Sequence, residues 1–144
     1  VAERYANLLH ANIAIVHKRR VRGVKNAVEA KDVVGEVEGK TCVLIDDMID
    51  TGGTLVAAAE QLAERGAASV YAAATHGVFS GPAIDRIKNS VLEKVVITNT
   101  LPLPPEKQID KIEVLSAAGI IADAIDAVFE DTSVSDIFDG QNQH

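Results

Sequence analysis

Residues 43–55 have the sequence Val-Leu-Ile-Asp-Asp-Met-Ile-Asp-Thr-Gly-Gly-Thr-Leu, and the architecture of the chain follows from them. An apolar run from Cys42 to Ile45 is short enough to form a buried strand. Two adjacent acids, Asp46 and Asp47, stand where that strand is expected to end. A turn of small residues, 50–54, then opens an alanine-rich helix expected over residues 55–66. Strand, acidic end, turn and helix in this order indicate an open α/β sheet.

This arrangement has a direct chemical use, because ligands bind at the ends of strands in open α/β sheets. The carboxylates of Asp46 and Asp47 can accept hydrogen bonds from neighbouring sugar hydroxyls or hold a hydrated Mg²⁺. The turn presents backbone N–H groups and two hydroxyls, and the helix N-terminus adds partial positive charge, so a phosphate fits there. Glycine lets the backbone approach the anion. The stretch therefore predicts a site for a phosphorylated sugar.

Two other interpretations of this stretch are weaker. It could be an ordinary turn followed by a helix that Thr51 or Thr54 caps. That interpretation suits an isolated Thr-Gly-Gly-Thr turn, but it does not account for all thirteen residues. A nucleotide-binding P-loop is disfavoured because the lysine of that motif is missing.

Composition predicts one globular domain that spans residues 1–144. The chain has 144 residues, of which 47% are hydrophobic and 3% aromatic, so an aliphatic core is expected. The net charge of −7 argues against partners such as nucleic acid or an anionic membrane. Cys42 is the single cysteine, so no disulfide can form within the chain, which fits a reducing cytoplasm. Neither a signal peptide nor an apolar run of membrane-spanning length is visible.

A basic run is the second chemical feature. Residues 17–25 contain five of the 14 Lys and Arg residues and follow a short strand expected at residues 12–16. If that strand joins the same sheet, the run lies at the same edge as Asp46 and Asp47. Most charge runs are solvated loops, but this neighbourhood favours a mobile loop that closes over phosphates and neutralises charge during phosphoryl transfer.

The remaining periodicity alternates between strands and helices. Strands are expected at residues 69–75, 95–98 and 111–115, and helices at 1–11, 83–89 and 120–129. Such alternation predicts a mostly parallel sheet covered by helices on both faces.

Taken together, the chain resembles the C-terminal half of the ribose-phosphate pyrophosphokinases, the phosphoribosyl-pyrophosphate (PRPP) synthetases. Four stretches carry the resemblance: Lys18-Arg19-Arg20, the motif of residues 43–54, Thr75-His76 with residues 79–82, and Ser133-Val134-Ser135 with Phe138. The resemblance implies a phosphoribosyltransferase-type, Rossmann-like α/β fold with a mostly parallel sheet flanked by helices.

The resemblance also implies an activity: transfer of the diphosphoryl group of ATP to O1 of ribose 5-phosphate, giving PRPP and AMP for nucleotide biosynthesis, with Mg²⁺ as cofactor. In that family Lys18 and Arg20 would act on a catalytic loop, and Arg20 would also reach substrate. Asp46 and Asp47 would bind the ribose hydroxyls. The residues that would hold the 5-phosphate are Asp50, Thr51, Gly52, Gly53 and Thr54.

Regulation and assembly are implied in the same way. Ser133 and Ser135 would lie at a subunit interface that binds ADP or phosphate as regulators; an N-cap pair for a short terminal helix is the alternative. The family forms hexamers, so a homo-oligomer is expected. The family is about twice as long, and its N-terminal half supplies ATP contacts and a metal-binding histidine. We therefore expect a fragment that is inactive alone.

Two other functions remain open on the same fold. A phosphoribosyltransferase would consume PRPP, but it requires a base-recognising hood, for which the chain offers no aromatic candidate. A non-catalytic PRPP-binding regulator typically has an altered motif or basic loop, and here both are intact apart from Val21, which stands where a proline commonly follows the basic triplet.

Overall fold

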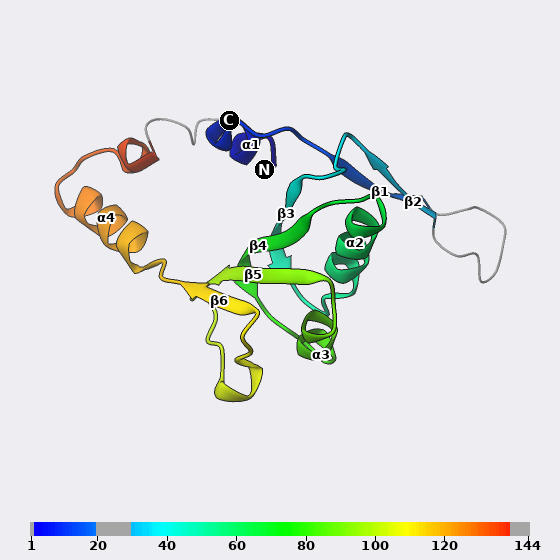
Figure 1. The fold of residues 1–144 in the computed structure, drawn as a ribbon. Helices are drawn as coiled ribbons and strands as arrows, with labels where there is room; N and C mark the ends of the chain where they lie inside the picture. The colour runs from blue at the N-terminus through cyan, green and yellow to red at the C-terminus, as the bar shows by residue number, and fades with distance from the viewer. Residues whose placement is uncertain (1, 20–29, 139–144) are drawn as a thin grey trace.

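The structure is a computed structural model that describes residues 2–19 and 30–138. Figure 1 shows the order of the elements along the chain. They are α1 (Ala2–Leu9), β1 (Ile15–Arg19), β2 (Ala30–Val34), β3 (Thr41–Ile49), α2 (Gly53–Glu64), β4 (Ser69–Gly77), α3 (Ala83–Lys88), β5 (Leu92–Thr98), η1 (Pro105–Lys107), β6 (Ile112–Leu115), α4 (Ala118–Phe129) and η2 (Val134–Phe138), where η denotes a 3₁₀ helix.

A four-stranded parallel sheet with the order β3-β4-β5-β6 is the centre of the fold. In its register Thr41 lies beside Ser69, and Ile49 lies beside Gly77. All four strands run the same way, so their carboxyl ends meet at one edge. The expected α/β class with a parallel sheet flanked by helices is confirmed.

Helices α2 and α3 bury one face of this sheet. Alternate residues of β4, namely Val70, Ala72 and Ala74, are buried against the apolar stripe of α2. Small residues are what allow the close approach, since Ala59 and Ala72 are both fully inaccessible to solvent. The largest fully buried side chains of this core are Phe79, Ile87, Leu92, Ile97 and Val95.

The other face is less covered than the sequence pattern predicts. Helix α1 lies near β3, whereas α4 extends beyond β6 and away from the sheet (Figure 1). Val43 on β3 is 49% exposed, and the apolar residues of α4 are exposed as well, with Phe129 at 84%. Helix α4 forms as expected, and within the described residues its main contacts are with η2.

The first strand differs most from its prediction. The chain is extended at residues 15–19 rather than 12–16, and it pairs antiparallel with β2 in a separate two-stranded sheet. Figure 1 shows this β1–β2 ribbon projecting away from the four-stranded sheet. The expectation that the basic run follows a strand of the central sheet is therefore wrong: Lys18 and Arg19 lie within β1 itself.

Strand β3 is longer than its apolar run. It continues through Asp46 and Asp47 to Ile49, because the hydrogen-bonded ladder with β4 runs on to Gly77. The acids thus lie inside the strand, and Asp50 is the first residue after it. Among residues 2–19 and 30–138, none of the helices has both the length and the apolar character that a membrane crossing requires.

Candidate functional site

The turn from β3 into α2 begins the candidate site. Gly52 is the N-cap of α2 and has φ +70°, a left-handed conformation that favours glycine. Among residues 2–19 and 30–138 no side chain caps the helix, so Thr51 and Thr54 do not play the capping role that an ordinary turn would give them. The hydroxyls of both threonines are therefore available to a ligand.

Hydrogen bonds to three successive backbone carbonyls, those of residues 49–51, fix the orientation of this turn. The amides of Val78 and Phe79 donate to the carbonyl of Ile49 over 3.0 and 3.1 Å. The amide of Ser80 donates to the carbonyl of Asp50 over 3.0 Å. The Arg86 Nη1 atom, on α3, donates to the carbonyl of Thr51 over 2.9 Å. Residues 78–86 thus hold the backbone of the turn on the side that its carbonyls face.

The amides of the turn face the opposite way. In a trans peptide the N–H of each residue points opposite to the carbonyl before it, so the N–H groups of Thr51 and Gly52 point away from residues 78–86. The first intrahelical bond of α2 runs from the Val56 amide to the Gly52 carbonyl over 3.0 Å. The amides of residues 53–55 precede it and have no intrahelical acceptor. Within the described part of the chain, residues 51–55 therefore offer a row of free donors.

The electrostatics of this row favour an anion. The N-terminus of α2 carries the positive end of the helix dipole, and the first turn contains no acidic residue. Gly53 has no Cβ, and one placed there would lie 3.2 Å from the Arg86 Nη1 atom. Backbone donors, helix dipole and a nearby guanidinium make residues 51–55, here called the cradle, a place suited to an anion, and the binding of a phosphate there stays a prediction.

The tight turn after β4 depends on a glycine that the motif does not include. A Cβ on Gly77 would lie 2.6 Å from Phe79 Cε2 and 2.7 Å from Ile97 Cδ1. Phe79 itself has φ +50° and is 1% exposed. The Phe79 ring fills the space that a side chain on Gly77 would need. This packing holds residues 78–80 where their amides donate to the carbonyls of Ile49 and Asp50.

The two acids of β3 lie on the strand that leads into the cradle. Asp46 and Asp47 are exposed, and the Asp47 amide donates to Asp46 Oδ1 over 2.8 Å. Consecutive residues of a strand alternate between its faces, so the two carboxylates diverge. Among the described residues no group of three His, Cys, Asp or Glu side chains is placed to hold a metal.

This donor set still fits one mode of Mg²⁺ binding. Mg²⁺ commonly takes only one or two protein carboxylates and completes its shell with water and substrate phosphates. Asp46, Asp47 or Asp50 could supply those carboxylates, since all three are exposed.

The other predicted site residues lie elsewhere or outside the description. The backbone of Lys18 belongs to β1, opposite Lys31 of β2, whereas Arg20 lies outside the described residues. Ser133 and Ser135 flank the start of η2, where the Ser135 amide donates to Ser133 Oγ over 3.2 Å. This bond is the capping pattern offered as the alternative for that pair.

Sequence reasoning missed the contacts of two side chains, of which only the first lies beside the cradle. Arg86 is one, and a lone arginine on a short helix gives no signal. The other is His76, whose Nδ1 lies 2.8 Å from Thr100 Oγ1 at the carboxyl ends of β4 and β5. Thr98 Oγ1 and Thr100 Oγ1 both reach the Thr75 carbonyl, at 2.7 and 3.2 Å. The Thr75-His76 pair was noted only for its resemblance to the family.

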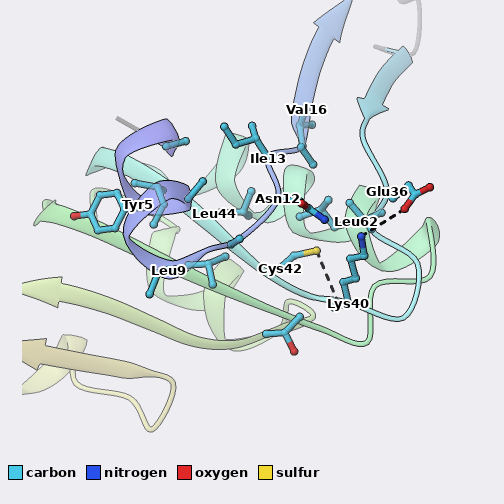
Figure 2. A pocket seen from close by; sticks show the side chains of 18 of the residues that line it. Tyr5, Leu9, Asn12, Ile13, Val16, Glu36, Lys40, Cys42, Leu44 and Leu62 are labelled. Carbon is cyan, nitrogen blue, oxygen red and sulfur yellow. Dashed lines mark hydrogen bonds and ion pairs between the residues drawn. The ribbon is translucent and has the colours of Figure 1, made fainter.

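A pocket of about 460 Å³ lies at the other end of β3 (Figure 2). Side chains from α1 and the segment after it, including Tyr5, Leu9 and Ile13, face Cys42 and Leu44 of β3 across it. Burial raises the pKa of the Cys42 thiol, with Lys40 partly opposing that effect. This pocket is mainly apolar and lacks the anion donors of the cradle, so it is not the phosphate site.

Comparison with known proteins identifies a family and relatives for most of the chain. A family described as the phosphoribosyl synthetase-associated domain matches residues 19–139. A ribose-phosphate pyrophosphokinase of Streptomyces avermitilis is 56% identical over 141 residues, which are 98% of this chain and 44% of the relative. One from Caldanaerobacter subterraneus is 52% identical over 137 residues, covering 95% of this chain and 43% of the relative.

A solved structure supports the fold as well. The crystal structure of phosphoribosylpyrophosphate synthetase from Mycobacterium smegmatis superimposes with a TM-score of 0.82 at 45% identity, covering 90% of this chain and 41% of that one. The chain therefore spans less than half the length of the relatives it matches. By its sequence and its fold, it belongs to the family of the ribose-phosphate pyrophosphokinases, the PRPP synthetases.

Proposed function

We propose that this chain is the C-terminal, sugar-phosphate-binding half of a PRPP synthetase, folded as one domain over residues 1–144. The reaction is transfer of the β,γ-diphosphoryl group of ATP to O1 of ribose 5-phosphate, giving PRPP and AMP in the cytoplasm. The observation that supports it most is the row of free amides at residues 51–55, held in place by residues 78–86. The named relatives favour a synthetase over a phosphoribosyltransferase.

The cradle would bind the 5-phosphate. Backbone donors of residues 51–55 and the hydroxyls of Thr51 and Thr54 match a phosphate's several acceptor oxygens. Asp50 starts the turn, and Gly52 and Gly53 let the backbone approach. Asp46 and Asp47 would accept hydrogen bonds from ribose hydroxyls at the same end of β3.

The chemistry requires charge neutralisation more than a nucleophilic side chain. The O1 oxygen of ribose 5-phosphate attacks the β-phosphorus of ATP, the bond from that phosphorus to the α,β-bridging oxygen breaks, and AMP leaves with that oxygen. Mg²⁺ bound to the triphosphate would withdraw negative charge from it. Lys18 and Arg20 would stabilise the charge that develops on the transferring group. The acceptor hydroxyl's proton is released.

Lys18 gives a test of the transfer step. In the active synthetase that carries this sequence, Lys18→Ala should lower kcat by about 100-fold or more, because its charge acts mainly in the transition state. The KM for ribose 5-phosphate should change far less. Full turnover in the variant would contradict the role of the basic segment.

Binding of the sugar phosphate is the direct test of the cradle. Calorimetric titration of this chain with ribose 5-phosphate should show saturable binding, whereas ribose should bind much more weakly. Thr54→Val keeps the side-chain shape and removes one hydroxyl, so it should weaken only the phosphorylated ligand. Equal binding of ribose and ribose 5-phosphate would overturn the proposal.

Two finer parts of the proposal concern regulation and assembly. ADP or phosphate would act at Ser133 and Ser135 where subunits of a homo-oligomer meet. A hexamer is expected by likeness to the family, and the exposed apolar residues of α4 offer a surface for such contacts. The chain alone should release no AMP from ATP in the presence of ribose 5-phosphate and Mg²⁺.

A further inference from the structure

Arg86 occupies an unusual place beside the cradle. It lies on α3, in the helix–loop segment that follows β4, and none of the sugar-phosphate motif residues is near it in sequence. Its Nη1 atom nevertheless donates to the Thr51 carbonyl over 2.9 Å. It is also the heavy atom that a Cβ on Gly53 would meet first, at 3.2 Å. The guanidinium therefore bonds to the turn at Thr51 and occupies the space beside Gly53 that a side chain there would need.

The contact with Thr51 determines where the amide of Gly52 points. The carbonyl of Thr51 and the N–H of Gly52 belong to the same planar peptide unit, so fixing one fixes the other. Gly52 has φ +70° and no side chain, so the unit would otherwise rotate easily. The hydrogen bond from Arg86 thus selects the orientation in which the Gly52 amide points toward the ligand side.

The charge of Arg86 is not used elsewhere in the described part of the chain. Its guanidinium is exposed, and no ion pair joins it to a carboxylate among residues 2–19 and 30–138. A guanidinium has five N–H donors, and the Thr51 carbonyl accepts from one of them. The positive charge therefore adds to the potential at the start of α2, where the cradle is.

We propose that Arg86 is a positioning residue for the phosphate cradle, which orients the Gly52 amide through the Thr51 carbonyl and adds positive charge beside it. The inference rests on the proposed function for the identity of the ligand, a sugar phosphomonoester. The effect on the turn itself does not depend on that identity.

Three variants separate the two contributions. Arg86→Met removes both the hydrogen bond and the charge while keeping much of the apolar stem. Arg86→Lys keeps the charge but loses the planar, multi-donor head. Lys88→Met is the matched control, because Lys88 is an exposed cation on the same helix without a contact to the turn.

Two measurements are made on each variant of the chain. The first is the NMR order parameter of the amides of residues 51–55 without ligand, which reports how rigidly the backbone is held, and the second is calorimetric affinity for ribose 5-phosphate and for ribose. Arg86→Met should lower the order parameters at these amides and weaken ribose 5-phosphate binding by about tenfold, with ribose binding unchanged. Arg86→Lys should recover part of the affinity but little of the backbone order. Lys88→Met should match the original chain in both.

The outcomes distinguish this inference from the proposed function. If the original chain does not prefer ribose 5-phosphate, yet Arg86→Met alone lowers the order parameters at residues 51–55, the proposed function fails and the positioning role stands. If the order parameters and affinity of Arg86→Met equal those of the original chain, the inference is overturned. It is also overturned if Lys88→Met is equally damaging, because general charge would then account for the effect.

Discussion

Replacing Gly77 by alanine should destabilise the chain and weaken its sugar-phosphate site together. The added Cβ would lie 2.6 Å from Phe79 Cε2 and 2.7 Å from Ile97 Cδ1, whereas carbon atoms pack best at about 3.5–4.0 Å. Phe79 and Ile97 are each 1% exposed, so neither can swing into solvent. Relief of the clash requires shifts of about 1 Å in a packed core, which typically cost about 1–3 kcal/mol.

Urea unfolding followed by circular dichroism would measure this cost. With a slope of about 1–3 kcal/mol per molar urea, the unfolding midpoint of Gly77→Ala should fall by roughly 1 M. Gly119→Ala is the matched control: Gly119 lies in α4, a Cβ there has nothing within 4 Å, and, like Gly77, it is not a positive-φ glycine. Alanine is the better helix former, so this control should be neutral or slightly more stable.

The same variant tests how the site is supported. Phe79 and its neighbour Val78 donate to the Ile49 carbonyl, so moving Phe79 should disturb the cradle. Ribose 5-phosphate affinity of Gly77→Ala should fall even under conditions where the chain stays folded. An unfolding free energy within about 0.5 kcal/mol of the original, with unchanged affinity, would refute the packing argument.

Three further predictions address other parts of the molecule. Gly52→Ala places a side chain at φ +70°, which should lower the free energy of unfolding in urea by about 1–2 kcal/mol. The variant should also bind ribose 5-phosphate more weakly. Unchanged stability and affinity would contradict the need for glycine in this turn. Burial raises the pKa of the Cys42 thiol above that of an exposed cysteine, so less thiolate is present at a given pH. Alkylation by iodoacetamide should therefore reach half its maximal rate at a higher pH in the folded chain than in urea. Equal midpoints would refute that direction. Phe129→Ser on α4 should leave the unfolding free energy within about 0.5 kcal/mol of that of the original chain, since the ring is 84% exposed. It should reduce self-association measured by sedimentation velocity. A large loss of stability would show that α4 packs on its own sheet.

Local sequence predicts the elements whose conformation depends on residues close to them in the chain. Helix α2 forms because a run of alanine and leucine follows a glycine turn, and the turn itself lies where residues 50–54 predict it. The end of β3 could not be predicted from its apolar run, because pairing with β4 as far as Gly77 extends the strand through Asp46 and Asp47. Long-range pairing overrides local hydrophobicity there.

Features that depend on distant partners were missed. Strand β1 has an apolar start typical of a central strand, but its partner is β2, and the antiparallel ribbon they form is visible only in three dimensions. The periodicity of α4 predicts an amphipathic helix correctly, yet it says nothing about which surface the apolar side meets. Arg86 is a further case, since its role comes from one contact with Thr51.

The four hydrogen bonds from residues 78–86 to the carbonyls of residues 49–51 have a consequence for biosynthesis. The motif proposed to bind the sugar phosphate is translated well before the segment that orients it. On the ribosome, residues 43–55 would emerge and even form their helix without yet being able to hold an anion. Binding competence would appear only once β4, the turn at Gly77 and the helix carrying Arg86 have emerged and docked. A chain stopped after residue 77 would keep the whole motif and should lack the proposed sugar-phosphate binding.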